Sequence, residues 1–168
     1  MVNILLIGDQ QVGKTSWLNR ISGKKFHESY MTTIGKDMKE IAINDRKIFV
    51  HDIGGSERYH QSINMYYDIA DGALIFYDVR AEAQDSFNRI NYWRDKLRKD
   101  TPIVLIGNKA DLLDNRLDNF ISCKEDVNVS YPLIELLDKI PIIEHIEDTT
   151  ILNWMWGIVY YYFGLYAV

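Results

Sequence analysis

The sequence predicts an α/β fold, in which a mostly parallel, doubly wound sheet carries helices on both faces. Short apolar runs typical of strands alternate with longer stretches whose apolar residues recur at helical spacing. We expect strands at 2–7, 38–43, 47–53, 73–79, 102–107 and, weakly, 119–122, and helices at 14–22, 84–99 and 127–140. A length of 168 residues suits one domain with a full core.

Two local patterns support these assignments. Asn44 and Asp45 stand between the second and third expected strands, and because two residues of this kind make a tight turn, we expect an antiparallel hairpin there. In the second expected helix, Phe87, Ile90 and Trp93 recur at helical spacing, so they are expected to be core residues.

A phosphate-binding motif begins at Gly8, directly after the first expected strand. Residues 8–15 read G-D-Q-Q-V-G-K-T, which matches G-x-x-x-x-G-K-T in the strand–turn–helix context that this pattern requires. Gly8 and Gly13 permit backbone conformations in which successive N–H groups point at a phosphate. Lys14 would place its charge on the terminal phosphates, and the Thr15 hydroxyl would ligate Mg²⁺. The predicted nucleotide-binding residues of this segment are Gly8, Asp9, Gln10, Gln11, Val12, Gly13, Lys14, Thr15 and Ser16.

A second motif follows the expected strand 102–107. Asn108, Lys109 and Asp111 form N-K-x-D there, a pattern that is weak alone but informative behind a strand and downstream of a phosphate loop. The Asp111 carboxylate can accept hydrogen bonds from the two N–H groups on the edge of guanine, which adenine does not offer. The two motifs together predict that the ligand is GTP or GDP rather than ATP.

Further segments resemble those of small GTPases of the Ras superfamily, and the Rab branch most of all. Residues 30–35 (YMTTIG) resemble the Rab switch I segment. The resemblance implies the G-domain version of the P-loop NTPase fold, with Thr33 as a second Mg²⁺ ligand. It also implies that Phe26 lies against the guanine and that Tyr30 covers the phosphates.

The resemblance continues through two more motifs. Residues 52–59 (DIGGSERY) resemble the D-x-x-G and switch II segment, which implies that Asp52 holds Mg²⁺ through water and that the Gly55 N–H senses the γ-phosphate. Residues 122–124 (SCK) resemble the last guanine-binding motif, in which a backbone N–H meets the base carbonyl. The implied metal ligands are Thr15, Thr33 and Asp52, and the implied base-binding residues here are Ser122, Cys123 and Lys124.

The position after the D-x-x-G glycine departs from the family pattern. Ser56 stands where Ras and Rab proteins have the glutamine that orients the attacking water. A serine is shorter, so we expect slow intrinsic hydrolysis, although activating proteins that supply both a glutamine and an arginine would still act. Gln10 and Gln11 stand where relatives have small residues, and they either obstruct an arginine finger or point to solvent. The predicted catalytic residues are Lys14, Thr33 and Ser56.

The region between the last two guanine motifs is short. The resemblance covers about residues 1–140, the expected G domain, yet Asn108 and Lys124 are only 16 positions apart, roughly half of what the family uses. A helix normally found there has little room, which predicts that one flank of the sheet is poorly covered. Exposed apolar surface of that kind tends to be covered, and the candidate is the C-terminal extension 141–168.

The end of this extension is uncharged and aromatic. Residues 151–168 contain no Asp, Glu, Lys or Arg, and their aromatic residues are Trp154, Trp156, Tyr160, Tyr161, Tyr162, Phe163 and Tyr166. Eighteen residues is the lower limit for spanning a bilayer, and this composition suits an interface better than a span. Packing on the domain or a partner, membrane contact, and an atypical or disordered end all stay open. No C-terminal cysteine is present, so prenylation is not expected.

Composition narrows the function classes. The chain has 19 basic and 24 acidic residues, a net charge of −5, which does not suggest a nucleic-acid binder. Cys123 is the only cysteine, so we expect a reducing, cytoplasmic setting without disulfides, with membrane association left open.

Together these features predict a Rab-like guanine-nucleotide switch. GTP and Mg²⁺ would order the switch regions at 24–40 and 54–67, where effectors, an exchange factor and a GTPase-activating protein would bind, in vesicle traffic or signalling. The alternative is an interaction module that stays in the GTP state and acts as a scaffold or decoy for Rab partners.

Overall fold

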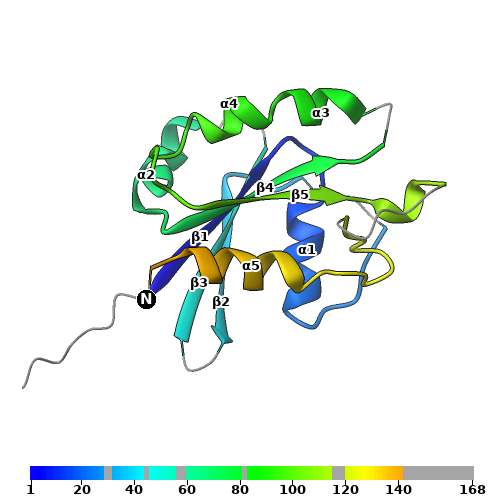
Figure 1. The fold of residues 1–168 in the computed structure, drawn as a ribbon, viewed down its shortest axis with the longest axis horizontal. Helices are drawn as coiled ribbons and strands as arrows, with labels where there is room; N and C mark the ends of the chain where they lie inside the picture. Colours follow the sequence, from blue (N-terminus) through cyan, green and yellow to red (C-terminus); the bar gives the residue numbers. More distant parts are fainter. Residues whose placement is uncertain (29–31, 44–45, 56–59, 81–82, 115–119, 142–168) are drawn as a thin grey trace, which may run out of the picture.

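The computed structural model describes residues 1–28, 32–43, 46–55, 60–80, 83–114 and 120–141 (Figure 1). Its sheet has five strands in the order β2-β3-β1-β4-β5. The strands are β1 (Val2–Gly8), β2 (Lys36–Ile43), β3 (Arg46–Ile53), β4 (Gly72–Asp78) and β5 (Ile103–Asn108). The helices are α1 (Lys14–Ile21), α2 (His60–Ile69), α3 (Gln84–Asn88), α4 (Ile90–Arg94) and α5 (Tyr131–Lys139), with a 3₁₀ turn η3 (Ala110–Leu112).

The strand directions confirm the mostly parallel sheet. β1 runs parallel to both β3 and β4, and β4 runs parallel to β5. Only β2 is antiparallel, paired with β3 so that Ile43 lies opposite Arg46. This confirms the hairpin, while Asn44 and Asp45 themselves lie outside the described residues.

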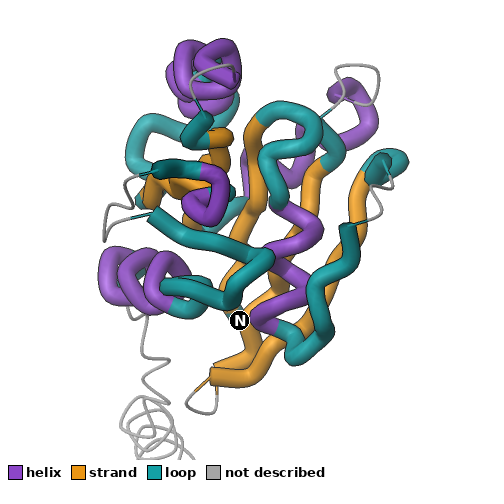
Figure 2. The backbone as a smooth tube through the Cα atoms, turned by 90° about the vertical axis from the view of Figure 1, so that its right-hand side faces the viewer, coloured by secondary structure: helices purple, strands orange, loops and turns teal. Residues whose placement is uncertain are grey.

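Helices cover both faces of the sheet, as a doubly wound fold requires (Figures 1 and 2). Because successive strand residues point to opposite faces, β1 supplies Leu6 to one core and Ile7 to the other. The first core contains Trp17 and Leu18 of α1 and Leu133 and Leu136 of α5. The second core contains Ile63 and Tyr67 of α2 and Trp93 of α4.

Three expected elements differ in the structure. The helix expected at 84–99 is two short helices, α3 and α4, because Arg89 between them has φ −88° and ψ 3°, outside the helical range. The helix expected from residue 127 begins at Tyr131, since Asn128 adopts a left-handed φ of 56°. The weak strand at 119–122 is reduced, within the described residues, to isolated bridges at Ile121 and Ser122.

Two further findings concern helices. α2 was not predicted, and it begins at His60, within the expected switch region 54–67. Trp93 is buried as expected, but Phe87 is 48% exposed and is not a core residue.

None of the helices in the described ranges has the length and apolar character that crossing a bilayer needs.

Candidate nucleotide-binding site

The phosphate loop joins the end of β1 to the start of α1. Gly8 has φ 137°, and a β-carbon there would lie 2.4 Å from the Phe76 carbonyl oxygen. Gly13 has φ 98°, and a β-carbon there would lie 2.1 Å from Asn108 Nδ2. Both positions therefore need glycine, for backbone conformation and for space. Gln11 also has a positive φ, 63°. This backbone conformation is higher in free energy for glutamine, which has a β-carbon, than for glycine.

Lys14 is held at the base of this loop. Its Nζ donates to the carbonyl oxygens of Gly8 and Asp9, each at 2.7 Å, and the side chain is buried. Burial lowers the pKa of Lys14 to about 8, while the negative charges of Asp52 and Asp9 oppose this shift. A phosphate brought beside the ammonium group would favour its charged form, so ligand and lysine stabilise each other's charge.

Three oxygen-bearing side chains meet beside Lys14. Thr15 Oγ1 donates to Asp52 Oδ2 at 2.5 Å and lies 2.9 Å from Thr33 Oγ1. Asp52 Oδ1 is buried and has no hydrogen-bond partner among the described residues, and burial raises the Asp52 pKa despite the Thr15 hydrogen bond and the charge of Lys14. Hydroxyl and carboxylate oxygens are the donors that Mg²⁺ prefers, and the unpaired buried oxygen suits a cation. The residues therefore fit the metal that the sequence predicts.

The two switch segments touch each other and the phosphate loop. The Gly54 N–H donates to the Gly35 carbonyl oxygen at 2.9 Å. A β-carbon at Gly55 would lie 2.6 Å from the backbone of Asp9 and of Gln10. The Gly55 backbone thus lies directly against the loop, at the place from which an N–H group could contact a terminal phosphate.

The base-binding motifs are bonded into one unit. Asn108 Nδ2 donates to the Val12 carbonyl oxygen at 2.9 Å, and Asn108 Oδ1 accepts from the Cys123 N–H at 3.3 Å. Ser122 Oγ donates to Asp111 Oδ1 at 2.6 Å, which orients that carboxylate. Asn108 therefore connects the phosphate loop to the 122–124 segment by hydrogen bonds. Ser122 contributes to the pocket indirectly, because it orients the Asp111 carboxylate.

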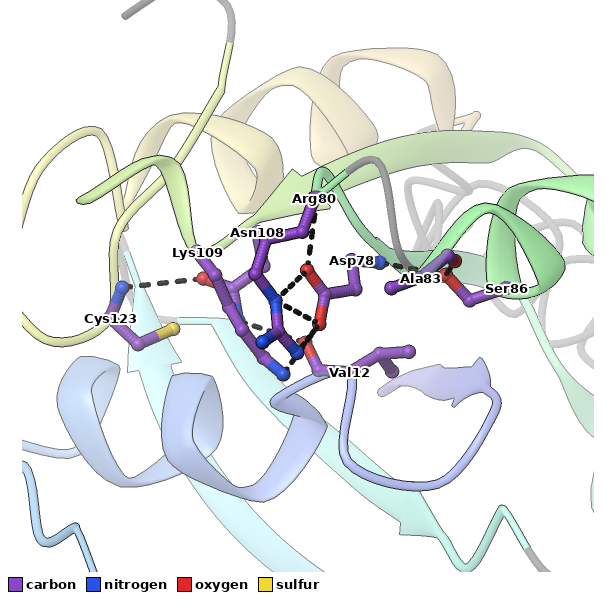
Figure 3. A network of polar contacts seen from close by, with 8 residues as sticks. All are labelled: Val12, Asp78, Arg80, Ala83, Ser86, Asn108, Lys109 and Cys123. Atoms are coloured by element: carbon purple, nitrogen blue, oxygen red, sulfur yellow. Dashed lines mark hydrogen bonds and ion pairs between the residues drawn. The ribbon is translucent and has the colours of Figure 1, made fainter. Parts of the chain in front are cut away.

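A network that the sequence did not reveal holds Lys109 (Figure 3). Lys109 Nζ donates to Asp78 Oδ2 at 2.6 Å, and Arg80 forms several hydrogen bonds to the same carboxylate. Burial alone would raise the Asp78 pKa, but the hydrogen bonds from Arg80 and Lys109 outweigh it and keep this pKa below its usual range. Ser86 Oγ accepts from the Asp78 N–H at 3.0 Å. The place of Asp78 at the end of β4, where ligands bind in such sheets, was the available signal.

Arg20 supports the base-binding segment from α1. Its Nε donates to the Cys123 carbonyl oxygen at 2.6 Å, and its Nη2 donates to the Lys124 carbonyl oxygen at 2.7 Å. Trp17 Nε1 donates to the Val129 carbonyl oxygen at 2.7 Å. These partners lie more than a hundred positions apart in the chain, so no local pattern could indicate them.

These elements surround a pocket of about 820 Å³, a size suited to a nucleotide. Predicted site residues that line it are Gln10, Gln11, Gly13, Lys14, Thr15, Ser16, Phe26, Thr33, Gly55, Asn108, Lys109, Asp111, Cys123 and Lys124. Gly8, Asp9, Val12, Asp52 and Ser122 are predicted site residues that do not line it. Tyr30 and Ser56 fall outside the described residues. Gln10 and Gln11 are both exposed where they line the pocket.

The Asp9 side chain does not line the pocket. Its Oδ1 accepts from Trp93 Nε1 at 2.9 Å and lies 3.3 Å from Arg89 Nε. Asp9 therefore connects the phosphate loop to α4 on the opposite side of the sheet, while its backbone carbonyl holds Lys14.

The Cys123 thiol is expected to resist thiol reagents in the folded protein. The side chain is buried, and burial raises its pKa to about 12. At pH 8 only roughly one thiol in ten thousand would be ionised, and the thiolate is the reactive form. Ellman's reagent should give no signal until the protein is denatured. Because Cys123 is the only cysteine, rapid stoichiometric labelling of the folded protein would contradict this burial.

Comparison with known proteins agrees with this geometry. Residues 3–139 match the model of the Ras family. The chain is 33% identical over 148 residues to GTP-binding protein ypt1 of Schizosaccharomyces pombe, a match covering 83% of this chain and 72% of that protein. It is 36% identical over 128 residues to Ras-related protein Rab7 of Drosophila melanogaster, covering 69% of this chain and 60% of that protein. For human Ras-related protein Rab-3A the identity is 32% over 164 residues, covering 83% and 74%.

The matched span contains the phosphate loop, both switch segments and both base-binding motifs. A family model that covers this much of the chain, together with relatives above 30% identity over most of it, identifies the family. The chain belongs to the Ras family and is a Rab-like small GTPase.

Proposed function

We propose that this chain is a guanine-nucleotide switch of the vesicle-traffic class, which binds GTP with Mg²⁺ and hydrolyses it to GDP. The observation that carries the proposal is one pocket lined by Lys14, Thr15, Thr33 and Asp111. Asp52 is hydrogen-bonded to Thr15, and Ser122 to Asp111. Lys14 and the loop N–H groups would bind the phosphates, and Asp111 would select guanine. Bound Mg²⁺ would neutralise developing charge on the phosphates. We assign this activity to a G domain at 1–140.

The switching element is the contact between the two switch segments. Thr33 lies against Thr15, and Gly35 accepts from the Gly54 N–H, so a ligand that binds Thr33 and Gly55 together would stabilise this closed arrangement. Loss of the γ-phosphate would remove that ligand and release both segments. Effectors, an exchange factor and an activating protein would then distinguish the two states at residues 24–40 and 54–67.

The test of this function is the nucleotide bound to freshly purified protein, released by heat and separated by ion exchange. Mostly GDP would support a cycling switch. Mostly GTP would support the second candidate, a GTP-bound scaffold or decoy for Rab partners, which Ser56 and the exposed Gln10 and Gln11 favour. An adenine nucleotide, or none, would contradict both.

Hydrolysis is expected to be slow because of Ser56, and Ser56→Gln should accelerate it. The longer amide would reach the attacking water that the serine does not. A gain of about tenfold corresponds to ~1.4 kcal/mol of transition-state stabilisation. Single-turnover hydrolysis measures it, with Ser130→Gln, an exposed serine at the start of α5, as the matched control. Equal rates for wild type and Ser56→Gln would refute the role given to Ser56.

Gly54→Ala is expected to weaken GTP binding more than GDP binding. A β-carbon there would lie 2.7 Å from the Thr33 carbonyl oxygen and 2.9 Å from the Gly35 carbonyl oxygen, so switch I must move away. We expect the ratio of GTP to GDP affinity to fall about tenfold, or ~1.4 kcal/mol. Competition against a fluorescent nucleotide gives this ratio. Gly23→Ala is the control for a glycine replaced without a clash, because nothing lies within 4 Å of its β-carbon position, although its φ of 76° is positive and that of Gly54 is not.

A further inference from the structure

β5 is one of the two edge strands of the sheet, and among the described residues its outward backbone groups are only partly paired. The Gly107 carbonyl oxygen accepts from the Ile121 N–H at 2.9 Å, and the Ile103 carbonyl oxygen lies 3.4 Å from Lys139 Nζ. Leu105 stands between them and, by the alternation of a ladder, directs its own N–H and C=O away from β4 as well. Among the described residues, no bridge forms at Leu105.

An apolar surface adjoins this edge. Leu105 is 49% exposed in the middle of its strand, and Phe87 of α3 is 48% exposed. Phe87 belongs to an aromatic group, in which the Tyr77 ring lies 5.2 Å from the Phe87 ring and 6.5 Å from the Phe120 ring. Tyr77 and Phe120 also lie beside Gly107, two positions after Leu105 on β5. We call Leu105, Phe87, Tyr77 and Phe120 the β5 surface. Contiguous exposed apolar surface of this kind is unusual unless something covers it.

The cause of the exposure is the short connection after β5. Along β5, Ile103 packs against the core under α2 and α4, but Leu105, the next residue on that side of the sheet, does not. The helical coverage in the described residues therefore ends between these two positions. Asn108 and Lys124 are only 16 positions apart. This connection is too short to add a further helix over the β5 surface.

The end of α5 lies near the first residue of β5. Pro141 is the last described residue, two positions after Lys139, whose Nζ lies 3.4 Å from the Ile103 carbonyl oxygen. The nine residues 142–150 can span about 30 Å when extended, whereas the six residues of β5 span ~20 Å. Residues 151–168 can therefore reach Leu105 and the full length of β5. They are uncharged and carry seven aromatic residues, which matches an uncharged surface built from aromatic rings and a leucine.

We propose that residues 151–168 dock on the β5 surface of the same chain. Their aromatic side chains pack against Phe87, Tyr77 and Leu105, and their backbone pairs with the outward N–H and C=O of Leu105. This replaces the coverage that the shortened connection lacks. A second copy of the chain and a lipid bilayer are the other possible occupants, and the experiment separates them.

The test is limited chymotrypsin digestion of the full chain, with cleavage inside 151–168 followed by mass spectrometry. In dilute wild-type protein without lipid, we expect cleavage in this segment to be slow. Leu105→Glu should accelerate it about tenfold, since a charge on the β5 surface opposes docking, and Phe87→Glu should act alike. Ile134→Glu is the matched control, because Ile134 is 53% exposed on α5, which covers the opposite face. A cooperative thermal unfolding transition would show that Leu105→Glu still folds.

Three outcomes would overturn the proposal. Equal cleavage rates in wild type and both glutamate variants would show that the segment is not docked there. Protection that grows with protein concentration would indicate a second copy. Protection that appears only with phosphatidylcholine vesicles would indicate a bilayer. None of these readouts depends on nucleotide hydrolysis, so this proposal and the switch function fail independently.

Discussion

Lys14→Ala is expected to abolish nucleotide binding. The Lys14 ammonium is buried at the base of the phosphate loop and is held by the carbonyl oxygens of Gly8 and Asp9. Its removal deletes the only buried lysine charge in the described residues that faces the phosphates and leaves two carbonyl oxygens without their donor. Loss of a buried charge contact of this kind costs about 3–5 kcal/mol, which lowers affinity a few hundredfold or more.

Purified Lys14→Ala should therefore carry no nucleotide, and titration with a fluorescent GDP analogue should give no saturation at micromolar protein. Lys25→Ala is the matched control, because Lys25 also lines the pocket but is exposed and is expected to retain bound nucleotide. Affinity within tenfold of wild type in a folded Lys14→Ala protein would show that the phosphates lie elsewhere.

Asp111→Asn is expected to change the base that the pocket accepts from guanine to xanthine. The Asp111 carboxylate would accept from two N–H groups of guanine, and an asparagine amide at this position would present a donor that suits the extra carbonyl of xanthine. Ser122 Oγ can still donate to the asparagine oxygen as it does to Asp111 Oδ1, so the segment should keep its arrangement. A site built to hydrogen-bond one base edge rejects a ligand that leaves its polar groups unpaired by a factor of roughly 10⁴.

Competition of xanthosine and guanosine diphosphates against a fluorescent nucleotide measures this change. Asp114→Asn, an exposed aspartate three positions later, should leave guanine preference intact. If Asp111→Asn kept its guanine preference, the base would have to lie elsewhere, and the guanine assignment would be wrong while phosphate binding could stand.

Much of the site was predictable because its motifs are continuous in the chain. The G-x-x-x-x-G-K-T segment contains its own strand end, glycines and helix start, so local chemistry places Lys14 and Thr15 together. The N-K-x-D motif likewise follows its own strand. The convergence of these motifs also follows from sequence, since the carboxyl ends of parallel strands meet at one edge of the sheet.

Other features depend on contacts between distant segments. The Asp78–Lys109 ion pair joins residues 31 positions apart, and Arg20 reaches the Cys123 carbonyl oxygen across 103 positions. The Asp9 carboxylate belongs to the phosphate loop by sequence, yet it is bonded to Trp93 of α4. None of these partners has a local pattern, because each side chain is typical of an exposed or loop position until the fold brings its partner close.

The sequence by itself determined the α/β class, the family and the chemical identity of the pocket, because strand periodicity and motif spacing are local properties. Only the tertiary structure decided which predicted core residues are covered. Phe87 has the spacing of a core residue, but burial needs a second element on top of it, and the short connection after β5 leaves Phe87 and Leu105 half exposed. Periodicity selects the face of an element that can be buried, whereas the packing of distant segments decides whether that face is covered.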